Sequence, residues 1–383
     1  MQHNRKIIYL VGFLFSLPVA LTAYINSSFL SSFVGEKLVA IVYVLGSTSS
    51  VMVLLFAPKI LKKIGGYKFL LWVVFLDILS ILAITLTTSI WSAGILFILF
   101  FSLNSLIFFS LDELSKIFSK DSNTGKVRGT YLAFTSCAWI VAQLASSTIL
   151  GEFSFQAIYF LAFLIMILCL LISFLKLKNI PDPQYDDSNA LKSIKEFFHN
   201  KNLTRAYGFS LLLQTFFCWM IIYTPIYLSA HLGFSWKEIS MIFAIMLLPF
   251  VIIPSPLGKY ADKIGERKIL MLGFLITSFT TISLFLIERH EIWIWALLLF
   301  ATRIGAATIE SMSDIYFLKH IRPENEEFLG VYRTATPVAF IIGPAVALLV
   351  LSLVPAFNYI YVVLGALMLY GVYLASKIKR GDV

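Results

Sequence analysis

Three ionisable residues lie in one apolar stretch of the chain, at residues 292–316: Arg303, Glu310 and Asp314. Their spacings of seven and four place them on roughly one face of a helix. Repulsion between carboxylates four residues apart should favour a proton on one of them, which makes the pair a candidate for proton coupling. The alternative interpretation is that both acids form structural ion pairs with Arg322 or Arg333.

Arg303 should lie near the middle of a membrane, because it is about 16 Å along a helix that starts near residue 292. Ionisable residues at that depth are costly and typical of functional sites. We therefore expect Arg303 to bind substrate or take part in coupling, and a structural ion pair is the alternative.

Other polar residues fall at similar depth in other apolar stretches: Asp77, Asn104 and Gln214. Asp77 is either a proton carrier or a buried partner of another group. These residues complete the set of substrate and coupling candidates.

The composition indicates that long helices in lipid must position these residues. Hydrophobic residues make up 59% of the 383 residues and charged residues only 13%, about half the charged share of a soluble protein. Runs of about 20 apolar residues can span the hydrocarbon as helices. About twelve such runs are predicted, centred on 7–27, 38–57, 69–88, 92–111, 129–150, 156–175, 206–229, 238–257, 269–287, 292–316, 330–352 and 356–376.

The distribution of basic residues predicts the orientation of these spans. Of the 30 Lys and Arg residues, only Lys37, Lys237 and Arg289 fall in loops on one side. By the positive-inside rule both termini are cytoplasmic, and the protein is multi-pass in a plasma or bacterial inner membrane. The net charge of +9 then faces anionic lipid rather than nucleic acid.

A polar segment at 178–203 divides the spans into two sets of six, with a short interfacial helix expected at 189–199. We predict an all-α membrane protein with an N-terminal six-helix bundle at 1–177, a cytoplasmic linker at 178–203 and a C-terminal six-helix bundle at 204–383. The halves align at an offset of about 200 residues, and both enter from the cytoplasm. They are therefore parallel repeats, related by an axis along the membrane normal.

A charged turn occurs once in each half, as PKILKKIGGYK at 58–68 and GKYADKIGERK at 258–268. The second copy resembles the signature loop of the major facilitator superfamily, Gly-x-x-x-Asp-Lys/Arg-x-Gly-x-Arg-Lys. The matching residues are Gly258, Asp262, Lys263, Gly265, Arg267 and Lys268. The first copy has Lys62 where the second has Asp262.

The resemblance implies twelve spans and transport by alternating access, with spans one, four, seven and ten lining a central cavity. That favours Arg303, Asn104 and Gln214 as cavity residues and makes Asp77 more peripheral. It also implies a cytoplasmic latch in which Asp262 pairs with Arg267 or Arg333; a plain basic turn is the alternative. Span five lacks the Gly-Pro pair frequent in the family's drug antiporters, so the sequence does not support a drug antiporter.

We therefore predict a secondary transporter of a small organic solute, driven by a proton or other ion gradient, with export slightly preferred over uptake. The alternative is a membrane sensor or scaffold that does not transport. Phosphate-binding, metal-binding and nucleophile motifs are absent from the sequence, so we expect neither an enzyme nor a cofactor. The protein is expected to be monomeric.

Overall fold

The computed structural model describes residues 2–116, 124–152, 154–178, 190–254, 257, 265–321 and 327–378. Regular structure in these residues is helical. Helices are expected here, because a chain in lipid must pair its backbone groups within the segment. The helices are α1 (Gln2–Ala23), α2 (Asn26–Val34), α3 (Glu36–Ile64), α4 (Gly66–Leu86), α5 (Ile90–Lys116), α6 (Thr124–Glu152), α7 (Phe155–Lys176), α8 (Ala190–His199), α9 (Lys201–Ile226), η1 (Tyr227–His231), α10 (Trp236–Leu247), α11 (Pro249–Ile252), α13 (Glu266–Phe285), α14 (Ile292–His320), α15 (Glu327–Arg333), α16 (Ala335–Leu353) and α17 (Tyr359–Ser376).

Eight helices in the described part of the chain are long and apolar enough to cross a membrane. A ninth span results if α1 and α2, which meet at a bend of 40°, are counted together. In the described residues of the other three predicted spans, at 38–57, 129–150 and 238–257, no helix meets this length and composition; Leu38–Leu54 and Phe134–Leu150 form shorter apolar helices. In the span at 238–257 Pro249 begins the four-residue helix α11 directly after α10, as expected of a residue that cannot continue the preceding helix.

The chain forms two compact units. The first contains Met1–Asp186 together with Ser235–Ala244, and the second contains Asp187–Phe234 and Ile245–Val383. Within the first unit, the segment Ser235–Ala244 contributes aromatic contacts to α7. The ring of Trp236 lies 4.9 Å from that of Phe155.

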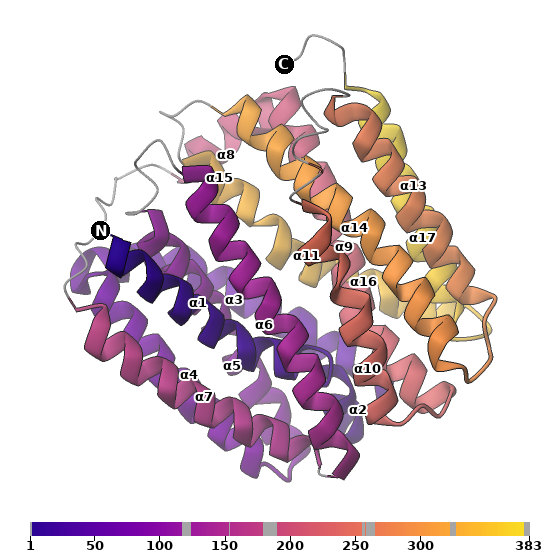
Figure 1. The fold of residues 1–383 in the computed structure, drawn as a ribbon, viewed down its shortest axis with the longest axis horizontal. Helices are drawn as coiled ribbons and strands as arrows, with labels where there is room; N and C mark the ends of the chain where they lie inside the picture. The colour runs from indigo at the N-terminus through magenta and orange to yellow at the C-terminus, as the bar shows by residue number, and fades with distance from the viewer. Residues whose placement is uncertain are drawn as a thin grey trace. The chain divides into compact units, whose positions relative to one another are not determined.

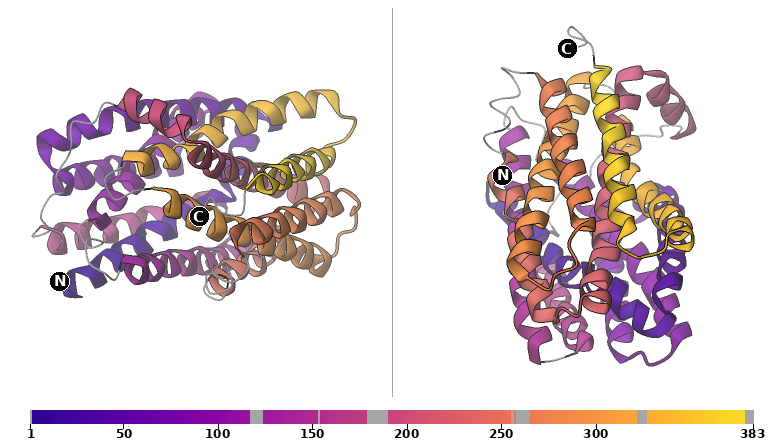
Figure 2. Two further views of the ribbon diagram at one scale, coloured as in Figure 1. Left: turned by 90° about the horizontal axis from the view of Figure 1, so that it is seen from above. Right: turned by 90° about the vertical axis from the view of Figure 1, so that its right-hand side faces the viewer.

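Helix packing within the two units follows one scheme. In the first unit α4 packs on α5 and α7, and α1 packs on α6 and α7; in the second α13 packs on α14 and α17, and α9 packs on α16 and α17. Figures 1 and 2 show α4 beside α7 and α13 beside α17. These pairs correspond under the offset of about 200 residues, so the repeat seen in the sequence is also a repeat of packing.

The predicted helix at 189–199 forms as α8 and belongs to the second unit. Its Phe197 is fully buried, and its ring lies 5.7 Å from that of Phe328 on α15 and 6.3 Å from that of Phe317 on α14. Burial of one large aromatic side chain contributes about 2 kcal/mol, which explains why α8 docks on this unit.

Candidate functional site

Helices α9 and α14 of the second unit pack against each other and run antiparallel. Asn202, near the start of α9, contacts Tyr316 near the end of α14, whereas Tyr227, the first residue of η1 after α9, contacts Trp295 near the start of α14. This register brings the α9 face that carries Ser210, Gln214 and Phe217 against the α14 face that carries the ionisable residues. These three α9 residues share a face because they are four and three positions apart.

A small pocket of about 40 Å³ lies where these two faces meet α15 and α16. Its lining combines two acids, one base and several hydroxyl and amide groups. The lining residues are Ser210, Leu213, Gln214, Glu310, Ser313, Asp314, Tyr332, Arg333 and Thr336. The pocket has room for a few water molecules and is too small for an organic solute.

The carboxylates of the pocket differ in their partners. The Tyr332 hydroxyl donates a hydrogen bond to Asp314 Oδ1 at 3.0 Å. Glu310 lies one turn away, within electrostatic range of Asp314, Arg333 and Arg303. The pocket therefore holds two carboxylates and the Arg333 guanidinium, with Arg303 nearby, so that a proton and an arginine can neutralise the same acid in turn.

Arg303 is fully buried on α14, with 1% of its surface exposed. Its Cζ atom lies 5.0 Å from the ring centre of Phe216 and 5.5 Å from that of Phe217. Cation–π attraction to two rings in a desolvated place is worth about 2 kcal/mol or more. The aromatic residues of α9 therefore hold the arginine two turns above Glu310.

Asp77 lies in the first unit, buried on α4 with 1% exposure. Ser80 Oγ donates to Asp77 Oδ1 at 3.2 Å, and Oδ2 has no hydrogen-bond partner among the described residues. Cys169 on the neighbouring helix α7 lies within electrostatic range of Asp77. The structure thus places Asp77 between α4 and α7, within a bundle that lacks the pocket described above.

The amide candidates also separate between the units. Asn104 is buried on α5 and donates from Nδ2 to the carbonyl of Phe100 at 2.8 Å, a bond within its own helix. Gln214 lines the polar pocket with Glu310. Of the six substrate or coupling candidates, Glu310, Asp314 and Gln214 therefore share the pocket, Arg303 adjoins it, and Asp77 and Asn104 belong to the other unit.

The charged turn is only partly described. Gly258, Asp262 and Lys263 lie outside the described residues, so the predicted latch at Asp262 lies outside them too. Gly265 has φ +81°, and Gly65 has the same φ in the first unit. Such backbone favours glycine, and each glycine is the N-cap residue directly before the helix that follows, α4 or α13. Arg267 and Lys268 are exposed, and Arg333 lines the pocket.

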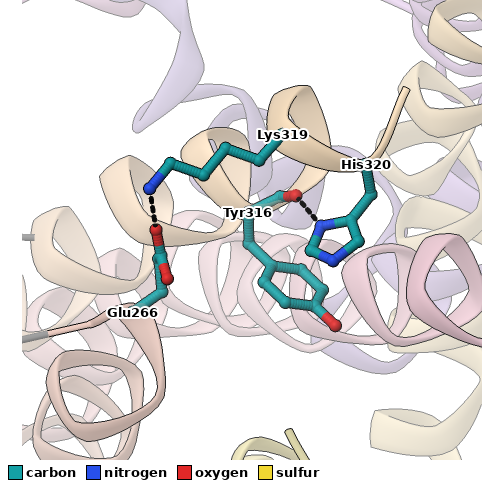
Figure 3. A network of polar contacts seen from close by, with 4 residues as sticks. All are labelled: Glu266, Tyr316, Lys319 and His320. Atoms are coloured by element: carbon teal, nitrogen blue, oxygen red, sulfur yellow. Dashed lines mark hydrogen bonds and ion pairs between the residues drawn. The ribbon is translucent and has the colours of Figure 1, made fainter. Parts of the chain in front are cut away.

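A buried acid in this turn was missed by sequence analysis. Figure 3 shows Glu266, on the first turn of α13, paired with Lys319 of α14; the Nζ–Oε1 distance is 2.5 Å. Glu266 is 4% exposed. The same view shows His320 Nδ1 at 2.7 Å from the Tyr316 carbonyl. Glu266 could not be singled out in the sequence, since its partner lies 53 residues away.

Close packing of α13 on α14 brings Glu266 and Lys319 together. A Cβ atom added to Gly305 would lie 2.6 Å from the Gly273 carbonyl oxygen and 2.2 Å from Thr277 Oγ1. The two helices therefore approach backbone to backbone near their middle, which small residues permit. Their ends at residues 266 and 319 are held within reach of one ion pair.

Metal binding has no support in the described part of the chain, where no group of three His, Cys, Asp or Glu side chains could hold an ion. The polar pocket instead offers charged and hydrogen-bonding groups for protons, water or part of a solute.

Solved structures of several transporters share this fold. They include the nucleoside transporter NupG (TM-score 0.74, 13% identity, covering 98% of this chain and 100% of that chain). An auto-inhibited POT family peptide transporter aligns with TM-score 0.80 and 9% identity, covering 99% of this chain and 98% of that one. A bacterial homologue of the human lysosomal transporter Spinster aligns with TM-score 0.69 and 12% identity, over 98% and 94%. At these identities the likeness concerns the fold alone.

The sequence itself matches a family profile over most of its length. The profile described as Major Facilitator Superfamily matches residues 114–237 and 220–380. No curated protein sequence matches the chain. The resemblance first seen in the turn at 258–268 is thereby confirmed, and the chain is an all-helical membrane protein, not an enzyme, that belongs to the Major Facilitator Superfamily of secondary transporters.

Proposed function

We propose that the protein transports a small organic solute by alternating access and couples that transport to protons at the pocket of Glu310 and Asp314. The observation that carries this proposal is that Glu310, Asp314 and Arg333 line one pocket of water size, with Arg303 within electrostatic range of Glu310. Two carboxylates one turn apart can share a proton, because two like charges repel at that distance.

In the proposed cycle, a proton on Glu310 removes that repulsion while the site is hydrated. When the pocket changes shape, an arginine approaches Glu310. Its positive charge then stabilises the carboxylate in place of the proton, which is released. Arg303 is the proposed link to the solute, because its guanidinium faces the aromatic rings of α9 at midplane depth. A buried cation of this kind suits a solute with an anionic or hydrogen-bond-accepting group.

The remaining predicted features belong to the same proposal. In this proposal both termini and the 178–203 linker lie in the cytoplasm, and the membrane is a bacterial-type inner or plasma membrane. Asp262 acts as the cytoplasmic latch, and export is the preferred direction. The protein works as a monomer.

The test uses the full chain in proteoliposomes that contain a pH-sensitive dye. A thermal-stabilisation screen on the purified protein first identifies a binding solute. Vesicles loaded with this solute and diluted should then change their internal pH as the solute leaves. Acidification of the lumen indicates antiport, consistent with export, and alkalinisation indicates symport.

Two outcomes separate the parts of the proposal. Solute movement that carries no proton, and ignores an imposed pH gradient, would overturn coupling while leaving transport in place. Binding without any solute movement, in a protein that purifies as a stable monomer, would overturn transport itself and favour a sensor or scaffold.

A further inference from the structure

An apolar groove of about 470 Å³ runs along the first unit between α4 and α7. Its walls are Leu71, Trp72 and Phe75 on α4 and Leu170, Leu171 and Phe174 on α7. One charged residue, Lys68, completes the lining.

The groove opens away from the core of the unit. Trp72 is 61% exposed and Phe174 is 58% exposed, whereas Val73 and Val74 on the adjoining face of α4 are buried. Both helices are long and apolar enough to cross the membrane. The exposed apolar face therefore meets lipid, and lipid chains are the molecules available to fill it.

Basic residues gather at the end of the groove where Lys68 lies. Lys68 stands three, four and seven positions before Leu71, Trp72 and Phe75, so it shares their face of α4. The Tyr67 hydroxyl donates to the carbonyl of Phe174 at 2.9 Å, which ties the start of α4 to the end of α7.

That tie brings the lysines that flank the two helix ends to the same end of the groove. Lys63 precedes α4, Lys176 is in the last turn of α7 and Lys178 follows it; all three are exposed. The sequence has no acidic residue between 57 and 72 or between 165 and 178. This end of the groove is therefore positive without an internal counter-charge from these segments.

We propose that the groove is a binding site for an anionic phospholipid, with one acyl chain between α4 and α7 and the phosphate at Lys68. The distance from Lys68 to Phe75 along α4 is about 10 Å, which is most of the depth of one leaflet. An acyl chain that enters the groove moves from bulk lipid to an apolar protein surface. Its binding therefore adds van der Waals contacts but no hydrophobic free energy. Selectivity for the headgroup therefore comes from the lysine, which reaches to the interface while its stem stays apolar.

One lysine close to an anionic membrane surface favours an anionic lipid about fivefold. The proposal does not depend on what the protein transports, because it concerns the lipid face of the first unit.

The test is quenching of Trp72 fluorescence by brominated lipids in vesicles that contain the full chain. Subtraction of a Trp72→Phe sample isolates the Trp72 signal from the other six tryptophans, the chain having seven. At a fixed low fraction of bromolipid, brominated phosphatidylglycerol should occupy the site about fivefold more than brominated phosphatidylcholine. Lys68→Gln should lower this preference to what the flanking lysines leave, and Lys68→Arg should retain it in full.

Trp91 provides the matched control. Trp91 is 79% exposed near the start of α5, which follows the end of α4 opposite to Lys68. The sequence from 85 to 96 contains no charged residue. Its signal, isolated with Trp91→Phe, should be quenched equally by both bromolipids. Equal quenching of Trp72 by both lipids, or a phosphatidylglycerol preference that is undiminished in Lys68→Gln, would overturn the proposal.

Discussion

The two units share their helix packing and their turns. They differ in the ionisable residues of two equivalent helices, α5 of the first unit and α14 of the second. Gly65 and Gly265 have the same φ, and each is the N-cap residue of the equivalent helix. Yet α5 has no ionisable residue between Ile90 and Leu111, and its Asn104 bonds to its own helix. In the corresponding stretch α14 carries Arg303 and Glu310. Packing and turning are thus common to both repeats, while between these bounds the ionisable residues occur on α14 and not on α5.

This difference indicates how a duplicated bundle divides its work. Equivalent helix contacts are needed in both halves, because each half must bury its own faces. A charged site is costly in a membrane, so the cluster of Arg303, Glu310 and Asp314 on α14 marks the second unit as the candidate for coupling.

The largest effect is expected for Glu310→Gln. Loss of the titrating carboxylate should reduce solute-driven pH change in proteoliposomes to the level of protein-free vesicles, since glutamine cannot carry the proton. The matched change in the first repeat, Ser110→Ala, removes only a hydroxyl that bonds to the Leu106 carbonyl at 2.8 Å and should leave the signal intact. Equal losses would show that the asymmetry has no role in coupling.

Arg303→Lys should lower the transport rate about tenfold. Lysine keeps the charge but loses the planar group that faces Phe216 and Phe217. A tenfold lower rate corresponds to the loss of about 1.4 kcal/mol of the cation–π attraction. Asn104→Ala, at the same depth in the first repeat, should stay within about twofold because its bond is local. The measurement is initial solute efflux at saturating load; a normal rate in Arg303→Lys would remove Arg303 from the site.

The two charged turns should also differ in transport. Asp262→Asn is expected to slow transport clearly, since it removes the acid of the predicted latch, whereas Lys62→Asn in the first copy should have little effect. Both variants are compared by the same efflux assay at equal protein content. If they behave alike, both loops are plain cytoplasmic turns.

The turn glycines should instead behave alike. Gly65→Ala and Gly265→Ala each force a side chain into a backbone region that favours glycine, at a cost of about 2 kcal/mol. Thermal unfolding in detergent should therefore give two similar decreases in Tm. A decrease in only one variant would break the structural equivalence of the repeats.

The smallest effect is expected at the Glu266–Lys319 pair. Lys319 is 35% exposed, so solvent screening reduces the contribution of the pair to about 1 kcal/mol. Glu266→Gln should lower Tm slightly, and Arg267→Gln, on an exposed neighbour, should leave it unchanged. A double variant with Lys319→Met tests the pairing directly: purely additive losses would mean that the two side chains do not interact.

Fold class and family could be predicted from the sequence because they rest on properties that repeat along the chain. Long apolar runs predict helices, since lipid offers the backbone no other partners. The copied turn at 58–68 and 258–268 revealed the duplication. Spacings of seven and four placed Arg303, Glu310 and Asp314 on one face, and they do lie along one side of α14 toward α9 and the pocket.

Other features depended on contacts between distant segments, which no local pattern encodes. The antiparallel register of α9 on α14 decided that Gln214 joins the pocket, whereas Asn104 turns to its own helix. The same kind of packing paired Glu266 with Lys319 and set Arg303 on Phe216 and Phe217. The sequence alone determined which residues are costly to bury in lipid, through their charge and their position in apolar runs. Only the tertiary structure decided which groups compensate that cost, because electrostatic and hydrogen-bond partners are selected by distance in space.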